Sequence, residues 1–212
     1  MKTRAVLRQE ILTLLKQGNF PVLVALAGQD NRVADLLLQF LYDPHDLVHW
    51  RALEGLGHVA HGHPPQVQKL ISRLLWLLNE DSGSFGWGAA AALGEIGRHE
   101  LPVVADIVPM FCGFLEERFS RVPMLWGIGR LAEVHPEVLA EVCPVVFACL
   151  QDEDPQVRGL SAWALGKLKA GEAREPLKNL LADEAPVQLY DQGELQRTTV
   201  ARLAREALAA LE

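Results

Sequence analysis

The stretch DEDPQVRGLSAWALGKL, residues 152–168, decides the fold class of this chain. Its aspartates and proline are typical of a turn, with Asp154 suited to cap a helix and Pro155 to occupy the first helical position. In the residues that follow, apolar side chains lie three and four positions apart, which is the spacing of one helical face. We therefore predict a tight turn followed by a helix.

Similar segments recur along the chain and indicate an internal repeat. VRGLSAWALG (157–166) aligns without gaps with VHWRALEGLG (48–57), FGWGAAAALG (85–94) and VARLAREALA (200–209), and RVPMLWGIGRLAEV (121–134) is a degenerate copy. Further stretches with helical spacing lie between these copies. The repeating unit is therefore helix, short turn, helix, about five times over. No alternating run indicates a strand, and DEAPVQLYDQGELQ (183–196) is interpreted as a loop insertion. The pattern predicts an all-α solenoid.

Residues 152–168 resemble the second half of a HEAT repeat of the phycobilisome-lyase-like type, and GWGAAAALGEIG (86–97) matches the latter part of that pattern. The resemblance covers most of the chain from about residue 31 onward and implies an α-α superhelix of about five HEAT-like hairpins. It does not select a function, because such repeats serve scaffolds, chromophore lyases, hydroxylases and DNA glycosylases. We expect one domain over 1–212, made of N-terminal capping helices (1–30) and repeats at 31–62, 65–98, 101–134, 136–170 and 173–212.

Composition narrows the class of partner. The chain has 212 residues and a net charge of −7, so it is repelled by a phosphate backbone and no nucleic-acid partner is expected. The N-terminal stretch 1–18 carries charges among its apolar residues, which indicates an amphipathic helix rather than a signal peptide. No apolar run is long enough to cross a bilayer. Cys112, Cys143 and Cys149 form no CxxC pair and are interpreted as buried thiols in a reducing compartment, which favours a cytoplasmic location.

The tryptophans are the leading candidates for binding. On a helical wheel of each second helix, Trp50, Trp87 and Trp163 fall opposite the face that packs on the partner helix, and Trp126 falls near the same place. In a solenoid that side lines the concave surface, where aromatic residues often anchor partners. The full predicted set is Trp50, Glu54, His58, Trp87, Glu95, Trp126, Trp163, Lys167, Arg202 and Glu206. The alternative is that neighbouring repeats bury these tryptophans. Trp76, in a first helix, is predicted to be core.

Few residues of the chain are candidates for binding a metal ion. His58, His61 and His63 lie close together at a helix end, where imidazoles can bind a transition metal or simply favour the negative end of the helix dipole. His99 and Glu100 are similar to the His-Glu pairs that hold two irons in deoxyhypusine hydroxylase, a HEAT-repeat protein. One pair supplies too few ligands for a di-iron centre. We therefore predict no metal, no cofactor and no catalytic residue.

The leading hypothesis is a non-enzymatic, cytoplasmic interaction or scaffold module that binds a protein or peptide partner in its concave groove and exists as a monomer or homodimer. An accessory lyase or an enzyme that binds a small ligand or metal is the alternative. HEAT-like alkylpurine glycosylases are a third comparison. These enzymes need a basic concave face for DNA, whereas the concave face predicted here carries charges of both signs.

Overall fold

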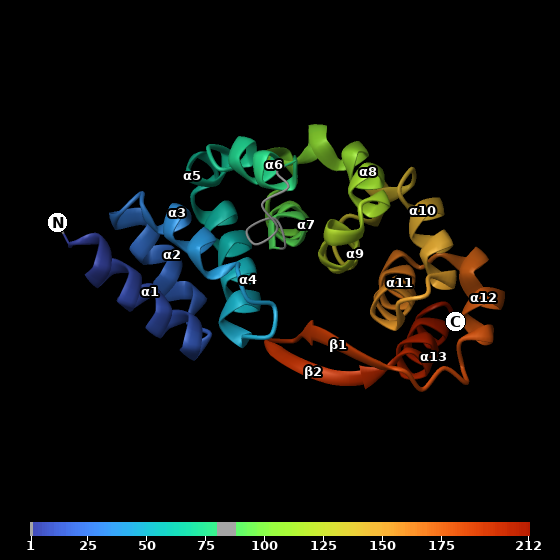
Figure 1. Ribbon diagram of the computed structural model, residues 1–212. Coiled ribbons are helices and arrows are strands. Elements are labelled where there is room, and N and C mark those ends of the chain that lie inside the picture. The colour runs from blue at the N-terminus through green and yellow to red at the C-terminus, as the bar shows by residue number, and fades with distance from the viewer. Residues whose placement is uncertain (1, 80–87) are drawn as a thin grey trace. The chain divides into compact units, whose positions relative to one another are not determined.

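The computed structural model describes residues 2–79 and 88–212, and it is mostly helical with one small two-stranded sheet (Figure 1). The α-helices and strands are α1 (Arg4–Gln17), α2 (Phe20–Gln29), α3 (Val33–Leu37), α4 (Leu47–Gly62), α5 (Pro64–Gln68), α6 (Ile71–Asn79), α7 (Ala89–His99), α8 (Phe111–Glu116), α9 (Arg118–Ala132), α10 (Cys143–Ala148), α11 (Pro155–Leu168), α12 (Arg174–Asn179), β1 (Pro186–Asp191), β2 (Glu194–Thr199) and α13 (Val200–Ala210). Short 3₁₀ helices connect them at η1 (Leu38–Phe40), η3 (Leu101–Val103), η4 (Ala105–Met110), η5 (Pro136–Leu139), η6 (Cys149–Gln151) and η7 (Gly171–Ala173).

The helix starts follow the capping chemistry of the sequence. Asp154 accepts a hydrogen bond of 2.8 Å from the backbone N–H of Gln156, and Pro155 is the first residue of α11, as predicted. Asp46 caps α4 in the same way. These caps satisfy backbone donors that have no partner inside the helix.

The chain divides into two compact units, one ending at Ala105 and the other beginning at Asp106. In the first unit, α4 contacts α1, α2, α3 and α7, and α6 covers α7. The run Ala89–Leu93 of α7 is completely buried. Gly57 of α4 explains why these helices approach so closely, since a Cβ there would lie 2.5 Å from the His99 ring and 2.9 Å from the carbonyl oxygen of Glu95. The small residues of the repeated motif are therefore helix-packing positions.

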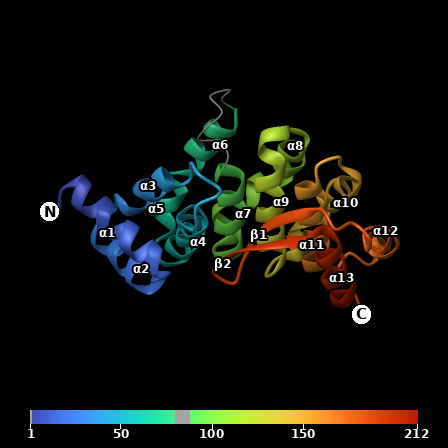
Figure 2. The ribbon, with the colours of Figure 1, turned by 60° about the horizontal axis from the view of Figure 1, so that its bottom comes forward.

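In the second unit, α11 lies between α9 and α13 (Figures 1 and 2). A Cβ on Gly166 of α11 would lie 2.8 Å from the Cα of Ala207 on α13. On the other side, a Cβ on Gly129 of α9 would lie 2.1 Å from the ring of Trp163. The glycines of the motif thus give each second helix a surface flat enough for its neighbour.

Two arginines at equivalent places bind these helices to the turns around them. Near the start of α9, Arg121 donates to the last carbonyls of α8 and, over 2.7 Å, to Asp152 in the turn before α11. Near the start of α11, Arg158 donates to main-chain carbonyls of that turn and, over 2.9 and 2.7 Å, to Asp183 after α12. Each arginine therefore joins consecutive turns of the second unit.

The segment interpreted as a loop insertion is a β-hairpin, so the all-α prediction is wrong there. β1 pairs antiparallel with β2, and the two-residue turn between them has positive φ at Gln192 (51°) and Gly193 (80°). Such a turn has the twist that a tight hairpin needs. Val187 and Leu189 of β1 are buried, and Val187 packs against α11 where Gly159 leaves room. Packing against a helix stabilises a ribbon that would be marginal alone.

The prediction that Trp76 is core is also wrong. Its side chain is 54% exposed, whereas α6 buries Ile71, Leu74 and Leu78. That buried stripe has spacings of three and four, which places position 76 on the opposite side of the helix.

Candidate functional site

The tryptophans of the second helices that the structure describes are interior residues. Trp50 is 8% exposed, Trp126 is fully buried and Trp163 is 6% exposed. Two of them form hydrogen bonds through the indole N–H: Trp50 donates to the carbonyl of Pro44 over 2.8 Å, and Trp126 donates to that of Tyr190 over 2.8 Å. The prediction of an open stripe of aromatic anchors is therefore wrong for these three residues. The alternative that the tryptophans are packed inside the fold describes them: Trp163 lies against Gly129 of α9, and Trp126 lies beside Tyr190 of β1. Trp87 lies outside the described residues.

Charged side chains lie directly above two of these rings in the second unit. The guanidinium of Arg130, 4% exposed, lies 5.5 Å from the ring centroid of Trp126. The ammonium of Lys167 lies 5.6 Å from the ring centroid of Trp163 and 2.8 Å from a carboxylate oxygen of Glu133. Glu133 also lies 3.5 Å from Arg130, so one carboxylate holds both cations over the aromatic layer.

A hollow of about 190 Å³ lies beside this layer, where α11, α13 and the end of β1 meet. Trp163 and Lys167 line it from α11, Asp191 from the hairpin, and Glu206 from α13 together with small and apolar residues. The structure therefore brings together three of the predicted binding residues, Trp163, Lys167 and Glu206. Arg202, one turn before Glu206, forms an ion pair with it over 2.9 Å.

Sequence reasoning missed Asp191, which lines the hollow, and Arg130 and Glu133, which lie in the charged layer beside it. Asp191 belongs to the hairpin, and its oxygen lies 3.9 Å from the buried Arg130. The alternation of Val187, Gln188 and Leu189 before a Gln-Gly turn was the available signal for a strand. Arg130 and Glu133 lie in the degenerate repeat copy, where the helical register was not fixed.

The remaining predicted residues belong to the first unit. Glu54 is partly buried on α4. His58 stacks on Phe20, with ring centroids 4.7 Å apart, and lies 4.5 Å from the ring of His99. Glu95 is completely buried, so the prediction that it offers a polar contact on an open surface is wrong.

The buried carboxylate of Glu95 is part of a local network in α7. One of its oxygens lies 3.2 Å from a guanidinium nitrogen of Arg98 and 3.1 Å from Nε2 of His99. A buried carboxylate needs such partners because desolvation penalises its charge. This His-Glu arrangement joins residues of one helix and stabilises its C-terminal half.

The histidines considered for metal binding have other neighbours. His61 lies 3.5 Å from Glu100, and Nε2 of His63 lies 3.0 Å from the carbonyl oxygen of Val24. Across the described residues, no group of three or more His, Cys, Asp or Glu side chains is placed to hold a metal ion. His63 is the C-cap residue of α4, and its backbone N–H donates to the carbonyl of Val59.

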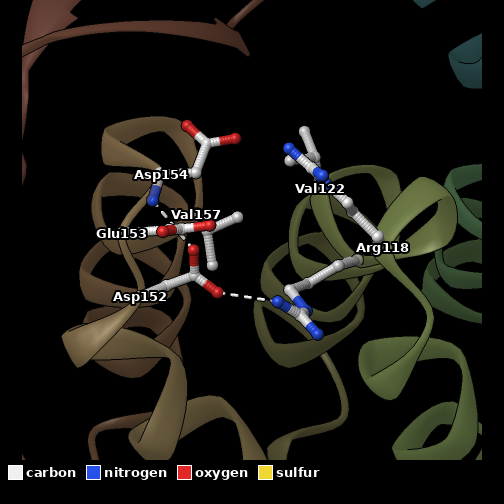
Figure 3. Close-up of a pocket in the computed structure, with 7 residues that line it drawn as sticks. Arg118, Val122, Asp152, Glu153, Asp154 and Val157 are labelled. Atoms are coloured by element: carbon white, nitrogen blue, oxygen red, sulfur yellow. Dashed lines mark hydrogen bonds and ion pairs between the residues drawn. The ribbon is translucent and has the colours of Figure 1, made fainter.

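A second hollow, of about 380 Å³, lies between the starts of α9 and α11 (Figure 3). Arg118 and Arg121 face it from α9, and Asp152, Glu153 and Asp154 face it from the other side. Two of these groups have structural roles already, since Asp152 binds Arg121 and Asp154 caps α11. The hollow is therefore mainly a consequence of how the helix ends are capped.

The three cysteines are free thiols. Burial raises the pKa of Cys149, which packs as core, and also those of Cys112 and Cys143, which are only half-buried. A raised pKa disfavours the nucleophilic thiolate. These groups lack the environment of a reactive cysteine.

The similarities of this chain to known proteins agree with the prediction of helical repeats. Residues 119–168, which run from the first turn of α9 to the end of α11, match the family of HEAT-like repeats. A protein of Archaeoglobus fulgidus described as uncharacterized is 28% identical over 172 residues, which are 79% of this chain and 91% of that protein.

Two crystal structures of engineered proteins have similar folds. One has a TM-score of 0.58 at 17% identity and covers all of this chain and 94% of its own. The other has a TM-score of 0.51 at 18% identity and covers 96% of both chains. In addition, no helix within residues 2–79 and 88–212 has the length and apolar character needed to cross a bilayer.

Proposed function

We propose that this protein is a non-enzymatic interaction module of the HEAT-repeat solenoid type that binds a segment of a protein partner. The observation that carries this proposal is the surface of the second unit where Lys167, Asp191 and Glu206 surround a hollow with Trp163 at its base. We call these four residues the α11–α13 surface. The HEAT-like match over part of the chain supports the proposal, as does the burial that makes this surface rigid.

The size and chemistry of the hollow favour a protein partner over a small molecule. Its volume of about 190 Å³ is below the roughly 300–1,000 Å³ typical of ligand pockets, so it suits a single side chain projecting from a larger surface. Glu133 and Trp163 hold Lys167 in place, so little side-chain entropy is lost on binding. A partner with both charges and one apolar side chain complements the mixed lining.

Membership of the phycobilisome-lyase-like branch, a cytoplasmic location and a monomeric or homodimeric state are parts of the same proposal. The proposal requires neither metal nor cofactor. It differs from the sequence-based hypothesis in the residues that contact the partner: these are the charged side chains of the α11–α13 surface rather than the buried tryptophans.

Charge-reversal variants test the proposal without removing a buried side chain. Lys167→Glu and Glu206→Lys change side chains that are 33% and 54% exposed, while Trp163→Ala would remove a buried ring. The matched control is Lys178→Glu on α12, which changes an exposed lysine away from this surface. Partners would be captured from the source cell and quantified by mass spectrometry, with circular dichroism as the check on folding.

We expect a partner that is retained by the wild-type chain and by Lys178→Glu, and lost from both surface variants. A partner that binds all four proteins equally would show that the α11–α13 surface is not the binding site.

A further inference from the structure

The outer edge of β1 is closed by side chains from the helices. The Gln156 amide donates to the carbonyl of Gln188 over 2.7 Å and accepts from the N–H of the same residue over 2.9 Å. Trp126 donates to the next outward carbonyl, that of Tyr190. Both main-chain groups of Gln188 and the carbonyl of Tyr190 are therefore satisfied by side chains on the side away from β2.

The outer edge of β2 is open. In the hairpin, Arg197 is opposite Gln188 and Leu195 is opposite Tyr190. Because opposed residues of an antiparallel pair alternate between bonding each other and bonding outward, Leu195 and Arg197 also direct their N–H and C=O groups away from β1. Over the described parts of the chain, no hydrogen bond is found for these four groups. β1 is thus protected and β2 is not.

We propose that this open edge of β2 is a strand-addition site for an extended segment of a partner protein that carries an acidic residue opposite Arg197. The inference rests on the proposed function as an interaction module and names a second contact for it. Addition of a strand to an exposed sheet edge is a recurring mode of peptide recognition, in which main-chain hydrogen bonds give affinity and side chains give specificity.

The backbone of β2 offers four hydrogen bonds to such a segment. In an antiparallel arrangement, one residue of the segment exchanges two hydrogen bonds with Leu195, and the residue two positions earlier exchanges two with Arg197. Four main-chain hydrogen bonds alone correspond to weak binding, with a Kd on the order of 1 mM. The edge therefore adds affinity to a contact made elsewhere rather than replacing it.

The side chain of Arg197 supplies the selectivity. It is exposed, and it forms no ion pair with the described residues. An acidic residue directly opposite it in the added strand would satisfy this charge, since opposed side chains in a sheet are close enough to interact.

A second copy of this chain does not complement the edge. In antiparallel pairing of two β2 strands, residues that bond outward oppose one another, so Arg197 faces Leu195, Thr199 or another Arg197. Glu194 is one position out of phase with Arg197, and its side chain lies on the other face of the ribbon. Antiparallel pairing of two copies therefore supplies no acidic residue opposite Arg197, and the proposal takes that residue from a different protein.

The first test is amide hydrogen exchange in the isolated protein, measured by NMR. We expect the amides of Leu195 and Arg197 to exchange quickly, while those of Gln196 and Thr198 are protected by pairing with β1. Equal protection at all four positions would overturn the inference, because it would mean that the outer edge is already bonded.

The second test adds the synthetic peptide Thr-Thr-Glu-Thr-Val-Thr, whose glutamate aligns with Arg197 and whose valine aligns with Leu195 when the strands are antiparallel. We expect shifts of the Leu195 and Arg197 amide resonances and slower exchange at both. The same peptide methylated on the glutamate and valine nitrogens keeps every side chain but loses two donors, and we expect it to produce no such shifts.

Charge swapping completes the design. Arg197→Glu should weaken the peptide about fivefold, the effect expected for one cross-strand ion pair, and a peptide with lysine in place of glutamate should then bind the variant better than the wild type. Shifts that persist with the methylated peptide, or that appear elsewhere, would overturn the proposal. These outcomes are independent of the Lys167 and Glu206 variants, so failure here leaves the α11–α13 surface untouched, and the reverse also holds.

Discussion

Replacing Gly129 with alanine tests how the second helices pack. A Cβ at this position would lie 2.1, 2.5 and 2.8 Å from three ring atoms of Trp163, whose side chain is 6% exposed. Overpacking of a core costs about 1–3 kcal/mol, and three overlaps with an enclosed ring place this site at the upper end. Alanine recovers about 1 kcal/mol of helix propensity. We therefore expect Gly129→Ala to lower the free energy of unfolding by about 2 kcal/mol.

Gly113 is the matched control, because it lies in α8 and a Cβ there would meet nothing within 4 Å. Gly113→Ala should leave stability unchanged or raise it by up to about 1 kcal/mol. The two substitutions are chemically identical, so a difference of about 2–3 kcal/mol between them isolates the contact with Trp163.

A double-mutant cycle confirms the cause. Trp163→Leu removes the ring and is itself destabilising, by about 2–4 kcal/mol. In that background Gly129→Ala should no longer clash and should be neutral or stabilising, which gives a coupling energy of about 2–3 kcal/mol. Urea denaturation followed by circular dichroism measures all four proteins. The reasoning is refuted if Gly129→Ala matches Gly113→Ala, or if its cost is unchanged in the Trp163→Leu background.

Three further predictions each concern one side chain. Burial lowers the pKa of His49 from 6.5 to about 4, so the unfolded chain is protonated at a higher pH than the folded chain. The free energy of unfolding should therefore be highest above pH 6.5 and fall by up to about 3 kcal/mol as the pH drops to 4. Urea denaturation across this range should detect the fall, and His49→Gln should abolish it. Arg158→Ala should cost about 2–3 kcal/mol because it removes the two hydrogen bonds that Arg158 donates to Asp183, and Arg158→Lys should recover part of that loss in the same assay. Trp126→Phe should cost about 1–3 kcal/mol because the buried carbonyl of Tyr190 loses its donor, and thermal melting that matches the wild type would contradict this assignment.

The sequence predicted local structure correctly where a single residue determines it. Asp154 and Pro155 predicted the start of α11 correctly, and apolar spacings of three and four predicted the helices. The candidate site was recovered only in part. Lys167 and Glu206 line one surface hollow, whereas Glu95 is buried. A helical wheel shows which residues share a face, and it does not show whether another helix covers that face.

The sequence by itself determined the mostly helical class, the capped turns and the small residues at which helices approach one another. Those features depend on neighbours within a few positions, or on a spacing repeated along the chain. Only the tertiary structure decided that Trp50, Trp126 and Trp163 are buried, that Trp76 is exposed, and that residues 186–199 form a hairpin. The physical reason is that burial depends on distant segments: Gly129 makes room for the ring of Trp163, and the hairpin supplies the carbonyl that the indole of Trp126 needs.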